Sequence, residues 1–488
     1  MAAIITEKFR QHNAEQFYES FSEAAATTYY LFIGKSSPFT SVTSGGDDTA
    51  PPTPVDDVTT EFYKWDSMLA AKQISSADIS YVIPRRNWTN STVYDMYEHD
   101  VSSSNTTTSG ASNLYDGTFY FMTSDYRVYK VLDNNGGATY SGAEPTSTSN
   151  TPFELGGYTL QYMYTLTTSQ VEKFVTSDFI PVVTDVTVSG AAVNGSIDVV
   201  RVTAGSGYTN GTYYSPIDGD GTGGIVEILV SSGQIQAQGS AGTNVYAIGS
   251  GYTYATVDLT NVYSDAALTT ATSIGSGTSG VVTPIISPKG GHGFNAVREL
   301  GGHYVMMNTT LAQFEGDDIT VANDFREVGI VRNPYNFGTT TVATASTRRQ
   351  TYAIKLASAP STDYEIDEKI TQSTTGAVGR VVEWDSTRNV LYYLQEQWSN
   401  YGIDATGNYV AFSGANTITG ANSGATGVPS STASENVTLP GGTTLTFSTG
   451  YANPELEPDS GDVLYVENRR PISRASDQTE DIKIIVEF

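Results

Sequence analysis

The residue types that most often carry chemistry are scarce in this chain and poorly spaced for it. It contains four histidines, His12, His99, His292 and His303, and no cysteine. His292 and His303 fall in GGHGFNAVRELGGHYV, where the spacing matches no HExxH-type metal motif. No G-x-S-x-G turn is present to carry a serine nucleophile. His292 and His303 are therefore predicted to pack in loops, and neither a metal site nor a cofactor is expected.

Carboxylates are abundant, but their local pattern does not suggest an active site. Three pairs of adjacent aspartates stand at 47–48, 56–57 and 317–318. A glycosidase needs two carboxylates facing one bond, whereas neighbours in an extended chain point in opposite directions. The run PIDGDGTGGIV at 216–226 lacks the ligand pattern of an EF-hand and favours a β-turn. The sequence predicts no enzyme, and a polysaccharide-degrading enzyme stays as a minor alternative.

The charge balance limits the classes of partner. There are 52 acidic and 25 basic residues, for a net charge of -27. Such a chain repels phosphate backbones, so nucleic acid is not an expected partner.

No apolar run is long enough to span a membrane, so no membrane insertion is expected. The N-terminal MAAIITEKFRQHNAEQF lacks the apolar segment of a signal peptide.

Two arginine pairs stand out in so acidic a chain, in VIPRRNW and in ENRRP. One interpretation is that their guanidinium groups hold carboxylates or backbone carbonyls at a domain or subunit seam. The other is that they form ordinary internal ion pairs, and the two are not exclusive. The candidate structural anchors in and after these runs are Arg85, Arg86, Trp88, Arg469, Arg470 and Asp477.

The elements that must position these residues are predicted to be mostly strands. The chain has 32 tyrosines and 47 glycines, and only 16% of its residues are charged, which favours strands and turns. A helix is expected near the N-terminus and another over 61–75. Strands are expected at 29–33, within 78–88, as a pair over 117–137, at 156–166, and at the C-terminus, where Ile482, Ile484, Val486 and Phe488 alternate with other residues. ENRRP is expected to be a fixed turn before that last strand.

Two regions repeat themselves. GSGYT occurs at 205–209 and 249–253, and GTGGIVEILV at 221–230 is echoed by GTSGVVTPII at 277–286. Further on, ITQSTTGAVG at 370–379 matches ITGANSGATG at 418–427. Glycines in such repeats permit tight turns between short strands, so both regions are predicted to be small all-β inserts.

The predicted fold class is therefore mainly β, a multi-domain β-sandwich-like body with a few short helices and two small all-β inserts. The predicted boundaries are 1–185 for the first part of the body and 186–289 for the first insert. The body continues over 290–364, the second insert covers 365–450, and 451–488 supplies a turn and a strand that complete the body.

Several longer motifs occur in a specific order: ITEKFR, YLFIGKSSPF, YVIPRRNW, GGYTLQYMY, DFREVGIVRNPY and YVENRRPISRASDQTEDIKIIVEF. In these motifs the chain resembles the baseplate wedge protein family, gene product eight, of T-even-like contractile-tailed bacteriophages. The resemblance covers about 1–185, 290–360 and 455–488. The two repeat-bearing inserts have no counterpart in the shorter members of that family.

The resemblance implies a mainly β structural protein of the virion, located in the tail baseplate and assembled in the host cytoplasm. It implies a homodimer that packs against other wedge subunits, including those that carry fibres. The implied work is mechanical, holding the wedge together and taking part in its rearrangement during tail contraction. No catalytic residue is implied.

An alternative function is a receptor- or glycan-binding tail protein that uses the inserts as its binding surface. The candidate stacking residues for sugar rings are Tyr208, Tyr213, Tyr214 and Tyr252. The competing interpretation is that these rings pack the core of the insert. The sequence leaves this choice open.

Overall fold

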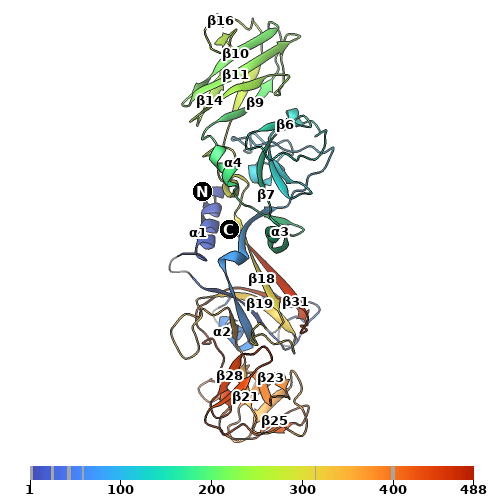
Figure 1. Ribbon diagram of the computed structural model, residues 1–488, viewed down its shortest axis with the longest axis vertical. Helices are drawn as coiled ribbons and strands as arrows, with labels where there is room; N and C mark the ends of the chain where they lie inside the picture. The colour runs from blue at the N-terminus through green and yellow to red at the C-terminus, as the bar shows by residue number, and fades with distance from the viewer. Residues whose placement is uncertain (1–3, 24–26, 41–44, 58–59, 314, 397–401) are drawn as a thin grey trace. The chain divides into compact units, whose positions relative to one another are not determined.

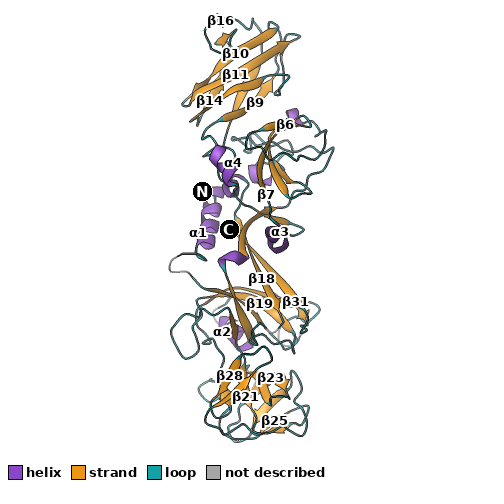
Figure 2. Cartoon of the chain, viewed as in Figure 1, coloured by secondary structure: helices purple, strands orange, loops and turns teal. Residues whose placement is uncertain are grey.

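The computed structural model describes residues 4–23, 27–40, 45–57, 60–313, 315–396 and 402–488. Strands far outnumber helices in this part of the chain (Figure 2). The predicted mainly β fold class is confirmed. No helix among the described residues combines the length and apolarity needed to cross a membrane.

The chain divides into two compact units. Unit 1 consists of Met1–Tyr18, Ser80–Met306 and Ile485–Phe488, and unit 2 consists of Glu19–Ile79 and Met307–Ile484. The domain boundaries suggested by the sequence stay a prediction. The helices are α1 (Glu7–Glu19), α2 (Thr60–Ser67), α3 (Thr168–Phe174), α4 (Val186–Ala191) and α5 (Ala296–Glu299), with 3-10 turns at Ser76–Asp78, Leu114–Asp116 and Asn135–Gly137.

A four-stranded sheet in unit 1 has the order β4-β5-β7-β6. Its strands are β4 (Tyr120–Met122), β5 (Arg127–Asp133), β6 (Phe153–Leu155) and β7 (Tyr158–Thr165). The paired strands expected over 117–137 are present, with Tyr120 opposite Lys130. Asn135 and Gly136 lie in the 3-10 turn that follows β5. Residues 128–133 are all buried, so β5 has covered side chains on both faces.

The residues of the first repeat region form a sheet and a separate strand pair in unit 1 (Figure 1). The pair is β9 (Ile197–Thr203) with β17 (Val281–Ile286). The sheet contains β10 (Gly211–Gly219), β11 (Thr222–Ser231), β12 (Gln234–Ile235), β13 (Asn244–Ser250), β14 (Ala255–Val257), β15 (Val262–Tyr263) and β16 (Ala271–Thr272). Tyr213, Ser215 and Ile217 alternate with more exposed residues along β10, so one face of the sheet covers the core.

The repeated motifs in this region pair with one another crosswise. Ser206 in the first GSGYT bridges to Thr278 in the second GTxG motif. The backbone nitrogen of Gly280 donates to Tyr208 Oη at 2.9 Å. A Cβ atom on Gly277 would lie 2.3 Å from Tyr208 Cδ1, so only glycine fits beneath this ring. We call this contact the Tyr208 pairing.

The second GSGYT makes the same contacts with the first GTxG motif. Gly224 N donates to Tyr252 Oη at 3.1 Å, and a Cβ on Gly221 would lie 2.4 Å from Tyr252 Cγ. Gly205 and Gly249, the first residues of the two copies, have φ of 60° and 59°. We call this contact the Tyr252 pairing. The two copies therefore form one structural unit in which each completes the other.

Unit 2 contains a five-stranded sheet of order β20-β2-β1-β19-β30. Its strands are β1 (Tyr29–Gly34), β2 (Met68–Ile74), β19 (Phe325–Arg332), β20 (Thr347–Arg349) and β30 (Asp462–Ile472). The expected strand at 29–33 is confirmed as β1. Residues 68–71 at the start of β2 are all buried.

Two expectations about this sheet are wrong. The helix expected over 61–75 ends at Ser67, and the rest of that range is β2. Because the start of β2 is covered on both faces, its apolar run has no alternation, and the spacing of Trp65 and Leu69 resembles a helical one. ENRRP, at 467–471, is not a turn, because it lies inside β30, where Asn468 pairs with Glu327 of β19.

The second repeat region lies in a seven-stranded sheet of unit 2, with the order β26-β25-β22-β23-β24-β21-β29. Thr371 and Thr419 occupy the same position in the two copies of the repeat, and they lie opposite each other in the antiparallel pair of β22 and β25. The two copies therefore pair about a local two-fold axis. The strands are β21 (Tyr352–Lys355), β22 (Lys369–Gln372), β23 (Val378–Asp385), β24 (Val390–Leu394), β25 (Ile418–Gly420), β26 (Thr426–Gly427) and β29 (Tyr451–Ala452), beside a hairpin of β27 (Glu435–Thr438) and β28 (Thr444–Phe447).

The last sheet has the order β31-β18-β3-β8. Its strands are β3 (Ile79–Pro84), β8 (Phe179–Pro181), β18 (Tyr304–Ala312) and β31 (Thr479–Glu487). The expected C-terminal strand is confirmed as β31, in which Ile482 and Ile484 are buried. The ring of Phe488 packs 5.3 Å from that of Phe17.

The Tyr252 pairing can be tested with Tyr252→Phe. The hydroxyl accepts from Gly224 N and donates to Ile217 O at 3.0 Å, both buried. Removing it leaves these backbone groups unpaired, at a cost of about 1–3 kcal/mol. We expect faster hydrogen exchange in β11 and β13, measured by mass spectrometry.

The matched control is Tyr246→Phe, because the Tyr246 side chain is 56% exposed on β13. That variant is expected to keep the protection of the parent chain. Equal protection in the Tyr252→Phe and parent chains would contradict the structural role given to the pairing.

Candidate functional site

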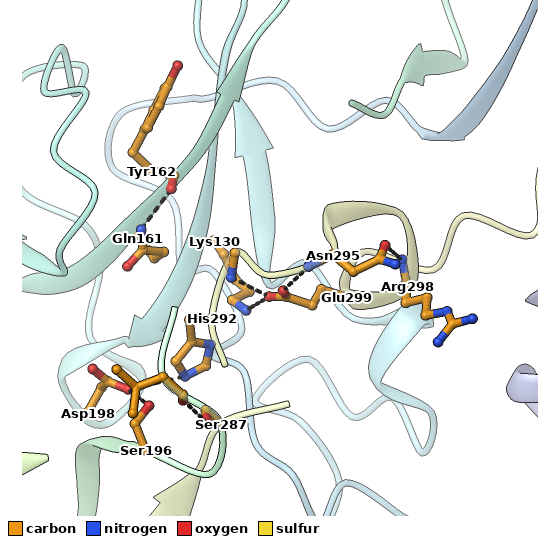
Figure 3. Close-up of polar contacts among 12 residues, drawn as sticks. Lys130, Gln161, Tyr162, Ser196, Asp198, Ser287, His292, Asn295, Arg298 and Glu299 are labelled. Atoms are coloured by element: carbon orange, nitrogen blue, oxygen red, sulfur yellow. Dashed lines mark hydrogen bonds and ion pairs between the residues drawn. The ribbon is translucent and has the colours of Figure 1, made fainter. Parts of the chain in front are cut away.

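No group of three side chains able to ligate a metal ion is found among the described residues. Chemically active groups gather instead in the interior of unit 1 (Figure 3). The Lys130 cluster, as we call it, consists of Lys130, Glu299, His292, Asp198 and Tyr97. These residues come from β5, α5, the loop before α5, β9 and the segment near residue 97.

The centre of the Lys130 cluster is a buried ion pair. Lys130 on β5 is fully buried, and its Nζ contacts Glu299 Oε2. The Glu299 carboxylate also accepts from the backbone nitrogens of Gly293 at 3.0 Å and Asn295 at 3.2 Å. Burial lowers the pKa of Lys130, and the charge of Glu299 opposes that shift. The pair therefore fastens the loop before α5 to β5, an inner strand of the β4-β5-β7-β6 sheet.

His292 lies in the same interior with neither ring nitrogen hydrogen-bonded to a described residue. Its ring packs edge-on against Tyr97 at 5.1 Å, and Nε2 lies 3.9 Å from Asp198 Oδ2. Burial, reinforced by the charge of Lys130, lowers the pKa of His292 well below its usual value. Burial also raises the pKa of Asp198, against a hydrogen bond from Ser196 Oγ at 2.7 Å. The arrangement suits a neutral imidazole that fills space in the core.

The first arginine pair contacts backbone carbonyls within unit 1. Arg85 Nη1 donates to Thr176 O at 2.8 Å, and Arg86 Nη2 donates to Tyr115 O at 2.9 Å. The guanidinium of Arg86 also lies 4.4 Å from the centre of the Tyr120 ring. These contacts fix the segment after β3 against its neighbours. An additional role at a subunit seam stays a prediction.

The remaining candidate anchors have less in common. Trp88 packs edge-on against Tyr140 at 6.1 Å, and its Nε1 has no hydrogen-bond partner among the described residues. On β30, Arg469 pairs with Glu467 at 3.1 Å, and Arg470 Nε donates to Thr49 O at 3.0 Å. Asp477 is exposed in the turn before β31. Arg85, Arg86 and Trp88 belong to unit 1, and Arg469, Arg470 and Asp477 belong to unit 2.

Three of the four candidate glycan-stacking tyrosines are buried in the core of the first repeat region. Tyr208, Tyr213 and Tyr252 are 8%, 6% and 3% exposed. A ring covered in this way offers no face to a sugar, so stacking at these three positions is incompatible with the fold. Tyr214 is half-buried and packs edge-on against exposed Tyr246 at 5.5 Å.

The aspartates considered as catalytic or calcium-binding groups hold turns and loops. Asp220 in PIDGDGTGGIV accepts from Thr253 N at 2.8 Å and Tyr254 N at 3.2 Å. A hydrogen bond from the Thr253 hydroxyl, together with these two backbone hydrogen bonds, lowers the pKa of Asp220 to about 2. Asp47 accepts from Thr49 N at 2.8 Å, whereas Asp48 pairs with Arg326 at 3.0 Å. The two neighbours thus serve different partners.

Sequence reasoning missed the most buried charged residues. Lys130 interrupts the apolar run YKVL, and that lone charge was the available signal for a buried ion pair. Its partner is far away in the sequence, so nothing local identifies Glu299. Arg326, Arg349 and Arg474 are similarly buried, at 5%, 5% and 8% exposure. Arg474 pairs with Glu480 at 3.0 Å and donates to the carbonyls of Thr320 and Gln313.

A family model described as "Bacteriophage T4, Gp8" matches residues 3–140. The matched segment is less than a third of the chain and contains α1, β1 to β5, Lys130 and the first arginine pair. No curated protein matches the chain. The family match supports a structural role in a phage baseplate and a location in the virion tail.

Replacing Lys130 by methionine tests the buried ion pair. The substitution leaves the Glu299 charge buried without its cation, which costs about 3–5 kcal/mol. Urea-dependent hydrogen exchange in β5 should report the loss. Lys130→Met/Glu299→Gln should regain part of it, because glutamine carries no charge. Lys8→Met, at an exposed lysine of α1, serves as control. If Lys130→Met were as stable as that control, the pair would contribute nothing.

The buried His292 predicts a pH dependence. Because its pKa is lowered on folding, the unfolded chain binds a proton below about pH 6.5 that the folded chain does not. Stability is therefore lost as the pH falls below that value, by about 1.4 kcal/mol per pH unit for one such group. In His292→Phe the urea midpoint of unit 1 should fall less between about pH 7 and 5. His12→Gln, at an exposed histidine, should keep the parent slope. An unchanged slope in His292→Phe would contradict the assignment.

Proposed function

We propose that the chain is a structural subunit of the baseplate wedge in a contractile phage tail. The observation that carries this proposal is the match of residues 3–140 to the Gp8 family model. The longer motifs at 156–164, 324–335 and 465–488 extend the resemblance beyond the matched segment. In this role the protein holds neighbouring wedge subunits together and takes part in their rearrangement during contraction. It acts as a homodimer and contacts other wedge subunits, including those that carry fibres.

The contacts of the described charged residues support a mechanical role. Arg85, Arg86 and Arg470 donate to backbone carbonyls, and Lys130 and Arg474 are engaged in covered ion pairs. Such groups serve to fix loops against strands, since each is already occupied by a partner within the chain. We therefore propose a protein without enzymatic activity, synthesised late and assembled into the tail in the host cytoplasm.

The burial of the candidate tyrosines argues against the glycan-binding alternative. It depended on four tyrosine rings in the first repeat region, and three of them are buried. Their hydroxyls are engaged as well: Tyr208 and Tyr252 accept from Gly280 and Gly224, and Tyr213 donates to Thr209 O at 3.0 Å.

The structural role predicts that the chain is a fixed component of the virion. Antibody raised against residues 186–289 and detected with immunogold should label the baseplate end of purified particles. Quantitative mass spectrometry of the same particles should give a constant copy number per tail. Light scattering of the purified chain should give the mass of a dimer.

Disrupted tails serve as the control for an epitope that is covered in intact particles. Labelling of fibre tips would favour the adhesin function. Absence of the chain from both intact and disrupted particles would overturn the proposal.

A further inference from the structure

Unit 1 contains a large groove that none of the contacts described above occupies. Its volume is about 1310 Å³, more than the roughly 300–1,000 Å³ of small-molecule sites. Its lining includes residues of α1, among them Lys8 and His12. The lining also includes Asn194, Thr253, residues 286–290, Phe294 and Asn295. We call it the α1 groove. Its size suits a segment of polypeptide better than a small ion.

The four carboxylates of the α1 groove are partly or fully covered, and each has a polar partner within unit 1. Glu15 pairs with Arg298 at 2.8 Å and its side chain is 20% exposed. The Glu98 side chain is 8% exposed and pairs with Arg201. Glu299 belongs to the Lys130 cluster. The fourth carboxylate, Glu7, accepts from Asn113 Nδ2 at 3.2 Å and lies 3.4 Å from His303.

The two lysines of the groove, in contrast, are exposed and have no carboxylate partner among the described residues. Lys8 and Lys289 line the groove and are both exposed. Among the described residues no carboxylate lies within ion-pair distance of either ammonium group. Unmatched cations are notable in a chain with a net charge of -27. They give the groove an attraction for carboxylates that most of the acidic surface lacks.

The groove also offers an apolar contact. Phe294 lines it with half of its side chain exposed, at 50%. An exposed aromatic beside unmatched cations favours a ligand that combines carboxylates with an apolar side chain. A nucleic acid fits less well, because the rest of the acidic chain repels a long polyanion.

From the volume, the two unmatched lysines and Phe294 we infer that the α1 groove binds an acidic segment of a partner protein. Carboxylates of that segment pair with Lys8 and Lys289, and an apolar side chain between them packs on Phe294. Exposed ion pairs contribute only about 0.2–1 kcal/mol each, so the lysines govern selection and association rate, while the apolar contact supplies most of the affinity. Lys8 lies within the segment matched by the family model, and Lys289 lies outside it.

Binding of labelled short peptides to the purified full chain, followed by fluorescence anisotropy, tests this inference. Three peptides of equal length with one central leucine are compared: one rich in glutamate and aspartate, one rich in lysine and one rich in serine. The acidic peptide should bind most tightly, and its binding should weaken as the salt concentration is raised. Lys8→Glu and Lys289→Glu should each weaken it about tenfold, because reversal turns an attraction into a repulsion. Phe294→Ser should weaken the binding of the acidic peptide and of the serine-rich peptide by the same factor.

The matched control is Lys483→Glu, which makes the same charge change on β31, in the unit 2 part of that strand. It should leave binding unchanged. Equal binding of acidic and serine peptides, or an equal loss in Lys483→Glu, would overturn the inference. So would tighter binding of a short single-stranded DNA that is weakened by the same two groove substitutions. Because this test needs no virion, its failure is separate from a failure of the proposed structural function.

Discussion

The buried ion pair between Lys130 and Glu299 is the constraint on which much of unit 1 depends. The Lys130 ammonium group lies on β5, a strand that is covered on both faces. Its charge is tolerated there only because it pairs with the Glu299 carboxylate. The same carboxylate holds Gly293 and Asn295 through their backbone nitrogens. The loop between β17 and α5 is thereby fixed, and with it the positions of His292 in the core and of Phe294 and Lys289 in the α1 groove.

The exposed and buried charges of the chain follow different rules. Buried arginines and lysines are each matched within the chain, mostly by backbone carbonyls or a single carboxylate. Arg474, for example, has Glu480 and two backbone carbonyls around its buried guanidinium group. Exposed Lys8 and Lys289 are not matched among the described residues. An acidic protein that leaves two cations unpaired in the lining of one groove has a surface suited to an acidic partner.

What the sequence predicts well is local. The alternation at the C-terminus marks β31, and the run at 29–33 marks β1, because side-chain period and burial coincide there. The helix over 61–75 fails past Ser67 because β2 is covered on both faces and shows no alternation. ENRRP was mistaken for a turn because its partner strand, β19, lies far away in the sequence. The Lys130 cluster and the α1 groove escape prediction for the same reason: their residues meet only after folding.

The crosswise pairing of the glycine and tyrosine motifs has a consequence for synthesis. The Tyr252 pairing joins residues 221–224 to 249–253, which leave the ribosome close together in time. The Tyr208 pairing joins 205–208 to 277–280 and encloses the first one in the chain. The inner contact is thus available to the nascent chain well before the outer one. Because β9 and β17 then pair, with Ile197 opposite Ile286, the chain leaves this region beside the place where it entered. A module closed in this way can be gained or lost by a protein without redirecting the strands on either side.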